Sequence, residues 1–357
     1  MKRICVAFAA LVLVSCATSS TASSPSALPA THDYGAAPAG VALIYIADPS
    51  HAGWYIGVDW SGKPRATMKL VQPLVPPQTL VQSPDGSAFM IPPFKGGSGA
   101  FLDRRGKQVA DANYTGQRMM WADDSRQFCQ LDFNPETSGG WQISLQAPGA
   151  KPAAHPVALD PNIVRSGIIA IDFASCSAKN DRAVLVYNYF DRPTELYVVR
   201  VSDGAVLLHQ THPPNLLSGI TASGDGTLIA EDSSKSSGYT AGPPAASTTV
   251  RRVVDGAVVA QLDPSFYVVA FSRDESLALV STTPLASGAP TNLAFVRLTD
   301  GAVLWHHSSA EEWGGRWVRP DGNDIASQLG PPQGLESGPI ELVIVHPDGS
   351  AAPLRLP

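Results

Sequence analysis

The feature that most constrains this 357-residue chain is a short turn sequence that recurs along it. One copy is Ser-Pro-Asp-Gly-Ser at 83–87, and its key residue is the Asp at 85. Related copies have their key residue at 124, 180, 225, 274 and 321, so successive gaps are 39, 56, 45, 49 and 47 residues. Apolar runs flank each copy, which predicts that each turn joins two β-strands.

A second turn signature lies between these copies. Asp-Gly between β-rich runs is a strong hairpin signal, because tight hairpins need residues that tolerate positive φ. Four clear copies are at 202–206, 254–258, 299–303 and 347–351, and looser ones are at 60–63, 104–107 and 147–150. Two hairpins in a unit of about 45 residues make four strands, which is typical of a β-propeller blade. Seven copies indicate seven blades.

We therefore predict an all-β fold, a seven-bladed β-propeller of four-stranded antiparallel blades. The blades are expected near 41–73, 78–114, 118–157, 165–210, 217–262, 267–307 and 314–356. Blade one shows only three clear strands, so its innermost strand is either absent or built from residues near 30–38. The last blade is complete to Pro357, and strand exchange between the first and last blades is not evident.

The repeat resembles that of bacterial lipoproteins with a WD40-like propeller of the Pro-Asp-Gly (PD40/YVTN) type, over roughly residues 40–357. The resemblance implies a scaffold that serves binding in some proteins and catalysis in others. The chain lacks the Gly-His and Trp-Asp pairs of true WD40 repeats, so their partner-binding residues are not transferred to it.

The first residues are typical of an export signal. A basic tip at Lys2 and Arg3 precedes an apolar stretch from Ile4 to Val14, and small residues follow. Leu-Val-Ser-Cys at 13–16 resembles a lipobox, which implies lipidation of Cys16 and, in a bacterium with two membranes, an outer-membrane lipoprotein facing the periplasm. The alternative is cleavage after Ala17, which gives a soluble periplasmic or secreted protein. We expect residues 1–16 to be a signal peptide, 17–38 a disordered tether rich in Ser, Thr, Ala and Pro, and 39–357 the propeller.

Charge and turn chemistry exclude several functions. The net charge is −6, and the mature region has no basic run, so nucleic acid is not an expected partner. The repeated Asp residues have a structural explanation, because an Asp at the start of a turn accepts hydrogen bonds from backbone N–H groups. They lack the alternating ligands of a calcium loop. We expect no cofactor or metal, and a monomer.

Blade topology gives the turns a common location. Connections between the first and second and the third and fourth strands leave one face of a propeller, which we call the turn face. The other connections leave the opposite face, the loop face, where we expect a protein or ligand to bind. Long segments there are 233–247, 284–291, 306–315 and 329–339. The candidate binding residues on this face are His209, His212, His306, His307, Glu311, Glu312, Trp313 and Arg316.

These residues have alternative roles. Two His and two Glu between Trp305 and Trp317 could ligate a metal, although adjacent His residues on a strand point to opposite faces, so a polar rim is the preferred interpretation. Trp313 and Trp317 could form a sugar platform or pack in the core. Arg118, Arg165 and Arg316 could bind an anion at the channel mouth or pair with nearby acids.

Cys129 and Cys176 remain in the mature region. Export permits a disulfide, and we predict the two residues in neighbouring blades, with Cys129 in a second strand and Cys176 in an enlarged turn.

No catalytic set is recognisable, so the leading hypothesis is a non-catalytic, lipid-anchored binding scaffold. The alternatives are a hydrolase or lactonase and a quinoprotein-like enzyme. Three or more His, Asp or Glu side chains around one point at the channel mouth on the loop face would favour an enzyme, whereas an apolar and aromatic patch there would favour binding.

Overall fold

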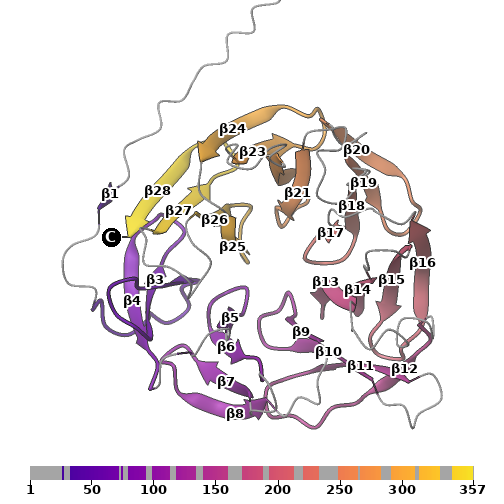
Figure 1. Ribbon diagram of the computed structural model, residues 1–357, viewed down its shortest axis with the longest axis horizontal. Helices are drawn as coiled ribbons and strands as arrows, with labels where there is room; N and C mark the ends of the chain where they lie inside the picture. Colours follow the sequence, from indigo (N-terminus) through magenta and orange to yellow (C-terminus); the bar gives the residue numbers. More distant parts are fainter. Residues whose placement is uncertain are drawn as a thin grey trace, which may run out of the picture.

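The computed structural model describes most of the chain after the leader. The described residues are 26–27, 33–71, 74, 79–93, 99–112, 118–133, 140–159, 171–187, 193–212, 220–232, 248–263, 266–282, 291–309, 313–329 and 340–356. Their regular structure consists of strands, arranged as a ring around a central channel (Figure 1). Within these residues, no helix has the length and apolar character needed to span a membrane.

The strands follow one another in blades. Blade one contains β2 (Ile44–Ala47), β3 (Trp54–Val58) and β4 (Pro64–Lys69); blade two β5 (Val81–Gln82), β6 (Ala88–Ile91), β7 (Gly99–Asp103) and β8 (Gln108–Ala112). Blade three contains β9 (Arg118–Trp121), β10 (Phe128–Phe133), β11 (Trp141–Gln146) and β12 (His155–Val157); blade four β13 (Ile171–Ser177), β14 (Arg182–Tyr187), β15 (Thr194–Arg200) and β16 (Val206–His212).

The remaining blades continue this pattern. Blade five contains β17 (Thr221–Ala222), β18 (Leu228–Asp232), β19 (Thr248–Arg252) and β20 (Val258–Leu262); blade six β21 (Phe266–Phe271), β22 (Leu277–Thr282), β23 (Thr291–Arg297) and β24 (Val303–Ser309). Blade seven contains β25 (Trp313–Val318), β26 (Ile325–Leu329), β27 (Ile340–Val345) and β28 (Ala351–Leu356). An additional short strand, β1 (Ser26–Ala27), lies outside β28 (Figure 1).

The seven-bladed fold predicted from the repeats is confirmed. Consecutive strands of each blade pair in an antiparallel manner, and the first strand of each of blades two to seven lies next to the channel (Figure 1). Large apolar residues such as Trp141, Tyr197 and Phe295 are buried between blades. The propeller is therefore held together by apolar packing between successive sheets.

The turns have the predicted chemistry. The glycines of the seven third-to-fourth-strand hairpins all have positive φ: Gly62, Gly106, Gly149, Gly204, Gly256, Gly301 and Gly349. In the first-to-second-strand turns, Asp85 accepts hydrogen bonds from the Ser87 backbone N–H (2.8 Å) and from the Ser83 hydroxyl (2.9 Å). Asp225 and Asp274 accept equivalent bonds. The structural role assigned to the repeated Asp is confirmed at these turns.

Hydrogen bonds also connect the first turns of successive blades across the turn face. The Asp85 backbone N–H donates to the Ser125 hydroxyl (3.0 Å), and the Ala178 backbone N–H donates to Asp123 (2.8 Å). The Asn180 amide donates to the Asp225 carbonyl (3.0 Å). Further bonds join blades five and six, through Thr227 and Glu275, and blades six and seven, through Asn323 and Asp274.

Blade one has three strands among the described residues, as its sequence indicated. The second option for its innermost strand, residues near 30–38, is wrong for the part described. The Tyr34 N–H donates to the Thr67 hydroxyl (2.8 Å), and the Thr67 N–H donates to the Gly35 carbonyl (2.8 Å), which places this segment against the outermost strand β4.

Two described parts of the chain before residue 39 also contact the propeller. β1 pairs in parallel with β28, with Ser26 opposite Leu354 and Ala27 opposite Arg355. The N-terminal segment therefore contacts the outermost strands of blades seven and one, outside the expected 39–357 domain. Backbone pairing explains this contact, because a segment with few apolar side chains can still bond to an open strand edge.

Candidate functional site

The central channel contains a cavity of about 720 Å³. Its walls come from the innermost strands and from the first turns of blades two to seven, so it extends to the turn face. Apolar and aromatic side chains form much of the wall: Tyr45, Tyr55, Leu80, Val81, Met119, Met120, Trp121, Phe271, Trp317 and Val318. A concave, mostly apolar site with a few polar groups is typical of ligand binding.

Blade one shapes this cavity because it contributes no innermost strand among the described residues. Tyr45 on β2 and Tyr55 on β3, which would lie behind a first strand in a complete blade, line the cavity instead. Burial raises the pKa of each tyrosine to about 12. Both hydroxyls are therefore neutral donors at physiological pH. The Tyr45 hydroxyl is buried and has no hydrogen-bond partner among the described residues.

The aromatic wall is held in place by its neighbours. The Trp121 indole N–H donates to the Val81 carbonyl (3.1 Å), which satisfies its polar atom and fixes the ring between blades two and three. Phe101 and Phe128 contact the same ring edge-on, with centroids 5.8 and 6.2 Å from it. The ring is thus a fixed part of the wall.

Four basic side chains line the cavity: Lys179, Arg273 and Arg319 lie in or beside first turns at the turn face, and Arg316 lies within strand β25. Arg319 pairs with Asp321 (2.8 Å) and Asp324 (2.9 Å). Arg316 donates to the Val269 carbonyl (2.8 Å), and Arg273 donates to the Pro320 carbonyl. Arg316 makes no ion pair with a carboxylate among the described residues, whereas Arg273 lies near enough to Asp321 to help lower the pKa of that carboxyl.

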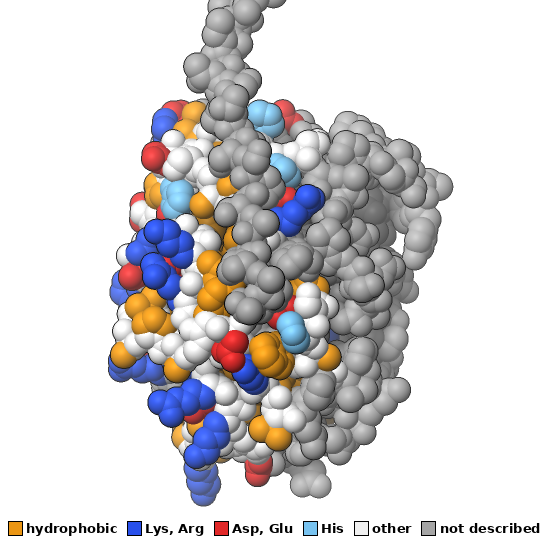
Figure 2. All heavy atoms as spheres, turned by 90° about the vertical axis from the view of Figure 1, so that its left-hand side faces the viewer, with side chains coloured by type: hydrophobic (Ala, Val, Ile, Leu, Met, Phe, Trp, Pro, Cys, Tyr) orange, Lys and Arg blue, Asp and Glu red, His pale blue; other side chains and the backbone are white. Residues whose placement is uncertain are grey.

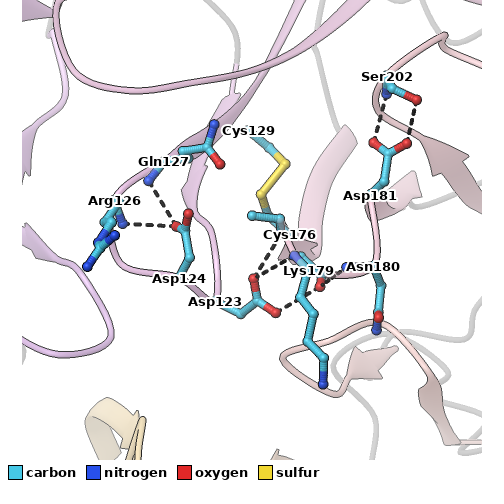
Figure 3. Close-up of a disulfide and its surroundings, with 12 residues drawn as sticks. Asp123, Asp124, Arg126, Gln127, Cys129, Cys176, Lys179, Asn180, Asp181 and Ser202 are labelled. Atoms are coloured by element: carbon cyan, nitrogen blue, oxygen red, sulfur yellow. Dashed lines mark hydrogen bonds between the residues drawn. A yellow bond between two sulfur atoms is a disulfide. The ribbon is translucent and has the colours of Figure 1, made fainter.

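Lys179 is the most available of these cations. Figure 3 shows its ammonium pointing away from Asp123, and no partner for the ammonium lies among the described residues. The Asp123 carboxylate instead accepts bonds from the Ser177 hydroxyl (2.8 Å) and the Ala178 backbone N–H (2.8 Å). An anionic ligand would therefore not need to displace a carboxylate from Lys179.

Two further carboxyl groups share the turn face between blades five and six. Burial would raise the pKa of Asp225, but hydrogen bonds from Glu275, Thr227 and Ser223 outweigh it and hold that pKa below its ordinary value. Burial raises the pKa of Glu275, and the hydrogen bond it shares with Asp225 raises it further. A proton held by this pair therefore resides on Glu275 rather than on Asp225. Among the described residues, no three His, Cys, Asp or Glu side chains could share a metal ion.

Cys129 and Cys176 form a disulfide. Cys129 lies in the second strand of blade three, as predicted, whereas Cys176 lies in the innermost strand β13 and not in a turn. The sequence ended that strand too early because β13 contains a bulge between Phe173 and Ser175, which adds a residue before the turn. Cys176 also lines the cavity, so the bond supports one wall of it (Figure 3).

The predicted histidines of blade four lie on its outermost strand, β16. His209 is hydrogen-bonded to Glu195 (2.7 Å) and stacks on Tyr197, with ring centroids 4.3 Å apart. His212 lies at the loop-face end, with its Nε2 3.6 Å from Glu231. These contacts are within the blade and with its neighbour, away from the cavity.

The described residues predicted in blades six and seven lie on two different strands. His306 and His307 lie on the outermost strand β24, where His307 stacks parallel to Trp305. Trp313 begins the innermost strand β25, and Arg316 is the member of the set that lines the cavity. Glu311 and Glu312 lie outside the described residues, as do Cys16, Arg165, and segments 233–247 and 330–339.

Sequence reasoning missed the cavity residues Tyr45, Trp121 and Lys179. The missing strand of blade one was the signal that could have found Tyr45, because an absent inner strand exposes the second strand to the channel. Arg118, considered for the channel mouth, donates to the Ile171 carbonyl (3.0 Å) of the next blade.

Comparisons with known proteins support the fold. No protein-family model matches the chain, and no curated protein matches it. A solved structure of KlAtg21 in complex with the coiled coil of AgAtg16 is similar over 87% of this chain and 92% of that one, with 12% identity and a TM-score of 0.55. The β-propeller domain of Cps50 (Swd1) from Myceliophteria thermophila matches over 85% and 96%, with 12% identity and a TM-score of 0.49. The chain thus has a WD40-like propeller fold.

Proposed function

We propose that this protein is a non-catalytic binding scaffold whose central cavity takes a ligand with an apolar body and an anionic end. The observation that carries the proposal is the pairing of an aromatic wall with the cations Lys179 and Arg273 at the turn face and Arg316 within strand β25. Burial of apolar ligand surface against this wall would supply most of the affinity. Cations without carboxylate partners among the described residues would orient the charged end.

The proposal moves the binding site from the loop face to the turn face. His209 and His212 contact their own or the neighbouring blade, and among the described residues of the predicted set Arg316 alone lines the cavity. The lining also bears on the enzyme alternatives, because it is apolar and aromatic, which favours binding over hydrolysis. The KlAtg21 structure, in complex with a coiled coil, supports the use of this fold for recognition.

We further propose that the scaffold is exported and held at the membrane by a lipid on Cys16. The lipobox-like sequence at 13–16 supports this location. The Cys129–Cys176 disulfide agrees with it, because disulfides persist in oxidising compartments. Export of the full chain and of Cys16→Ser into the envelope tests the anchor. The unaltered chain should stay in the membrane fraction and the variant should be released; equal release of both would contradict the anchor.

The cavity is tested with an anionic aromatic probe, 1-anilinonaphthalene-8-sulfonate, on the full chain carrying Cys16→Ser. Its fluorescence should rise on binding, and Lys179→Gln should weaken binding by about two- to fivefold, the range for one exposed charge contact. Arg252→Gln is the matched control, because Arg252 pairs with Asp255 on the outer hairpin of blade five. Absence of saturable binding, or equal loss in both variants, would overturn the proposed function.

A further inference from the structure

The inward edge of β2 resembles a sheet edge that awaits another strand. In an antiparallel pair, alternate residues turn their N–H and C=O toward the partner strand. The Asp48 N–H donates to the Trp54 carbonyl (2.9 Å), so Ile46 and Ile44 bond to β3 in the same register. Leu43, Tyr45 and Ala47 therefore present their backbone groups to the opposite side, where blades two to seven have an innermost strand.

Groups from blade two form hydrogen bonds with only some of the backbone groups on this edge. The Leu43 N–H donates to the Asp85 carbonyl (3.2 Å), and the Tyr45 N–H donates to the Gln82 side-chain oxygen (2.9 Å). The Ala47 N–H and the Tyr45 carbonyl oxygen have no partner among the described residues. The amide nitrogen of Gln82 is also buried without a described partner. Unpaired N–H and C=O groups along a strand edge can pair with an added strand, so this edge favours a ligand that bonds to it.

This edge belongs to the cavity wall. Tyr45 and Gln82 both line the cavity, and the buried hydroxyl of Tyr45, whose residue is 3% exposed, is unpartnered among the described residues. A strand rises about 3.3 Å per residue, so a segment of four to six residues would match the length of β2 and its neighbours. The cavity wall at β2 thus combines unpaired backbone groups, aromatic surface and enough volume for a short extended segment.

We propose that the ligand is an extended peptide that pairs with β2 and completes blade one as its innermost strand. This inference rests on the proposed binding function of the cavity and names the class of its ligand. Like the innermost strands of the other blades, the peptide would run antiparallel to β2, with its C-terminal end at the turn face. Strand addition supplies main-chain hydrogen bonds, and alternate side chains meet the wall.

Charge complementarity defines the end of the peptide. Lys179 and Arg316 line the cavity without ion pairs to carboxylates among the described residues, and Arg273 and Arg319 line it near Asp321. These four cations outnumber the two acids of the lining, Asp123 and Asp225, and hairpins of blades one and two add Lys63 and Lys107. Figure 2 shows Lys and Arg side chains gathered along one edge of the side that carries blade one. The occupant is therefore an apolar strand that ends in acidic residues.

The test uses defined peptides with the full chain carrying Cys16→Ser. The probe is an N-terminally labelled octapeptide, Thr-Val-Thr-Val-Thr-Val-Asp-Asp, followed by fluorescence anisotropy. One control peptide carries N-methyl groups on the residues whose N–H would face β2, and another ends in Lys-Lys. The probe should bind, and both controls should bind at least about tenfold more weakly, since each loses either the ladder or the charge contact.

Amide hydrogen exchange supplies the specific readout. Saturation with the probe should slow exchange of the Ala47 N–H at least about tenfold, because it gains a main-chain acceptor. Exchange at Ile46, whose N–H already faces β3, is the internal control. Probe binding without Ala47 protection would overturn strand addition. Naphthalene-sulfonate binding without any peptide binding would also overturn it while leaving the proposed function standing, whereas failure of both ligands would overturn both.

Discussion

At the residue scale, two hairpin glycines separate the energetic cost of a left-handed backbone from the cost of a close contact with a neighbouring blade. Gly204 has φ of +74°, and a Cβ there would lie 2.1 Å from the Pro156 carbonyl oxygen of the neighbouring blade. Gly256 has φ of +68°, but a Cβ there would meet nothing within 4 Å. Both positions therefore need a left-handed backbone, and they differ only in the room available for a Cβ atom.

Alanine at each position separates the two effects. Gly256→Ala should lower the free energy of unfolding by about 1 kcal/mol, which is the cost of the left-handed conformation. Gly204→Ala should cost about 2–4 kcal/mol, because the blades must also move apart. Urea unfolding of both variants measures the difference. Equal costs would show that the contact between blades three and four does not constrain Gly204.

The carboxyl pair Asp225–Glu275 predicts a pH-dependent stability. The pKa of Glu275 is raised in the folded protein, mainly by burial and then by Asp225, so its protonated form is favoured. That contribution is fully present below the ordinary value of 4.5 and is lost as pH rises through the raised pKa. Glu275→Gln keeps a neutral donor at every pH. It should therefore stabilise the protein at pH 7, with the gain vanishing below pH 4.5.

Asp274 gives the opposite sign and serves as the control. Burial would raise its pKa, but hydrogen bonds from the Ser276 backbone N–H and hydroxyl outweigh burial and lower it. Its contribution is present above the ordinary value of 3.8 and is lost as pH falls through the lowered pKa. Asp274→Asn should thus be less stable than the parent at pH 7. Thermal unfolding across pH 3 to 8 measures both, and the same sign for both variants would contradict this account.

At the element scale, the disulfide joins the second strand of blade three to the first strand of blade four. It closes a loop with a sequence separation of 47 residues, which restricts the unfolded chain. The double variant Cys129→Ala/Cys176→Ala should therefore lose about 2–4 kcal/mol of stability. Reductant should destabilise the parent by a similar amount and leave the double variant unchanged. Two reactive thiols in the unreduced parent would contradict the bond.

Elements were predictable from sequence where turn chemistry is local. Gly204 and Gly301 specify their hairpins through their own backbone, and the repeated Asp residues cap turns within two residues of themselves, so the blades could be counted. The cavity was not predictable in the same way. Tyr45 reaches it because a strand is absent among the described residues, and Lys179 because an inter-blade contact occupies Asp123. Both depend on tertiary arrangement, whereas the conspicuous His306 and His307 lie on an outermost strand.

At the scale of the whole molecule, the junction between blades seven and one differs from the others. Turn-face hydrogen bonds connect blade one to two and each following pair through to blades six and seven. Among the described residues, no such bond joins the turns of blades seven and one. Apolar packing of Ile46, Ile56, Leu342 and Ile344 closes this junction, and the N-terminal segment contacts the outer strands of both blades.

A ring closed mainly by packing should open first at that junction. Ile344 and Ile143 are both 0% exposed, but Ile344 lies between blades seven and one, and Ile143 lies in the disulfide-linked core of blades three and four. Ile344→Ala and Ile143→Ala should each lower the global stability by about 2–5 kcal/mol. Only Ile344→Ala should accelerate native-state hydrogen exchange selectively in β2–β4 and β25–β28, because opening there breaks no turn-to-turn bond among the described residues. Faster exchange spread evenly over all blades in both variants would show instead that the propeller unfolds as one unit. The outer N-terminal segment and the apolar contacts would then hold this junction as firmly as the turn-face hydrogen bonds hold the junctions between the other blades.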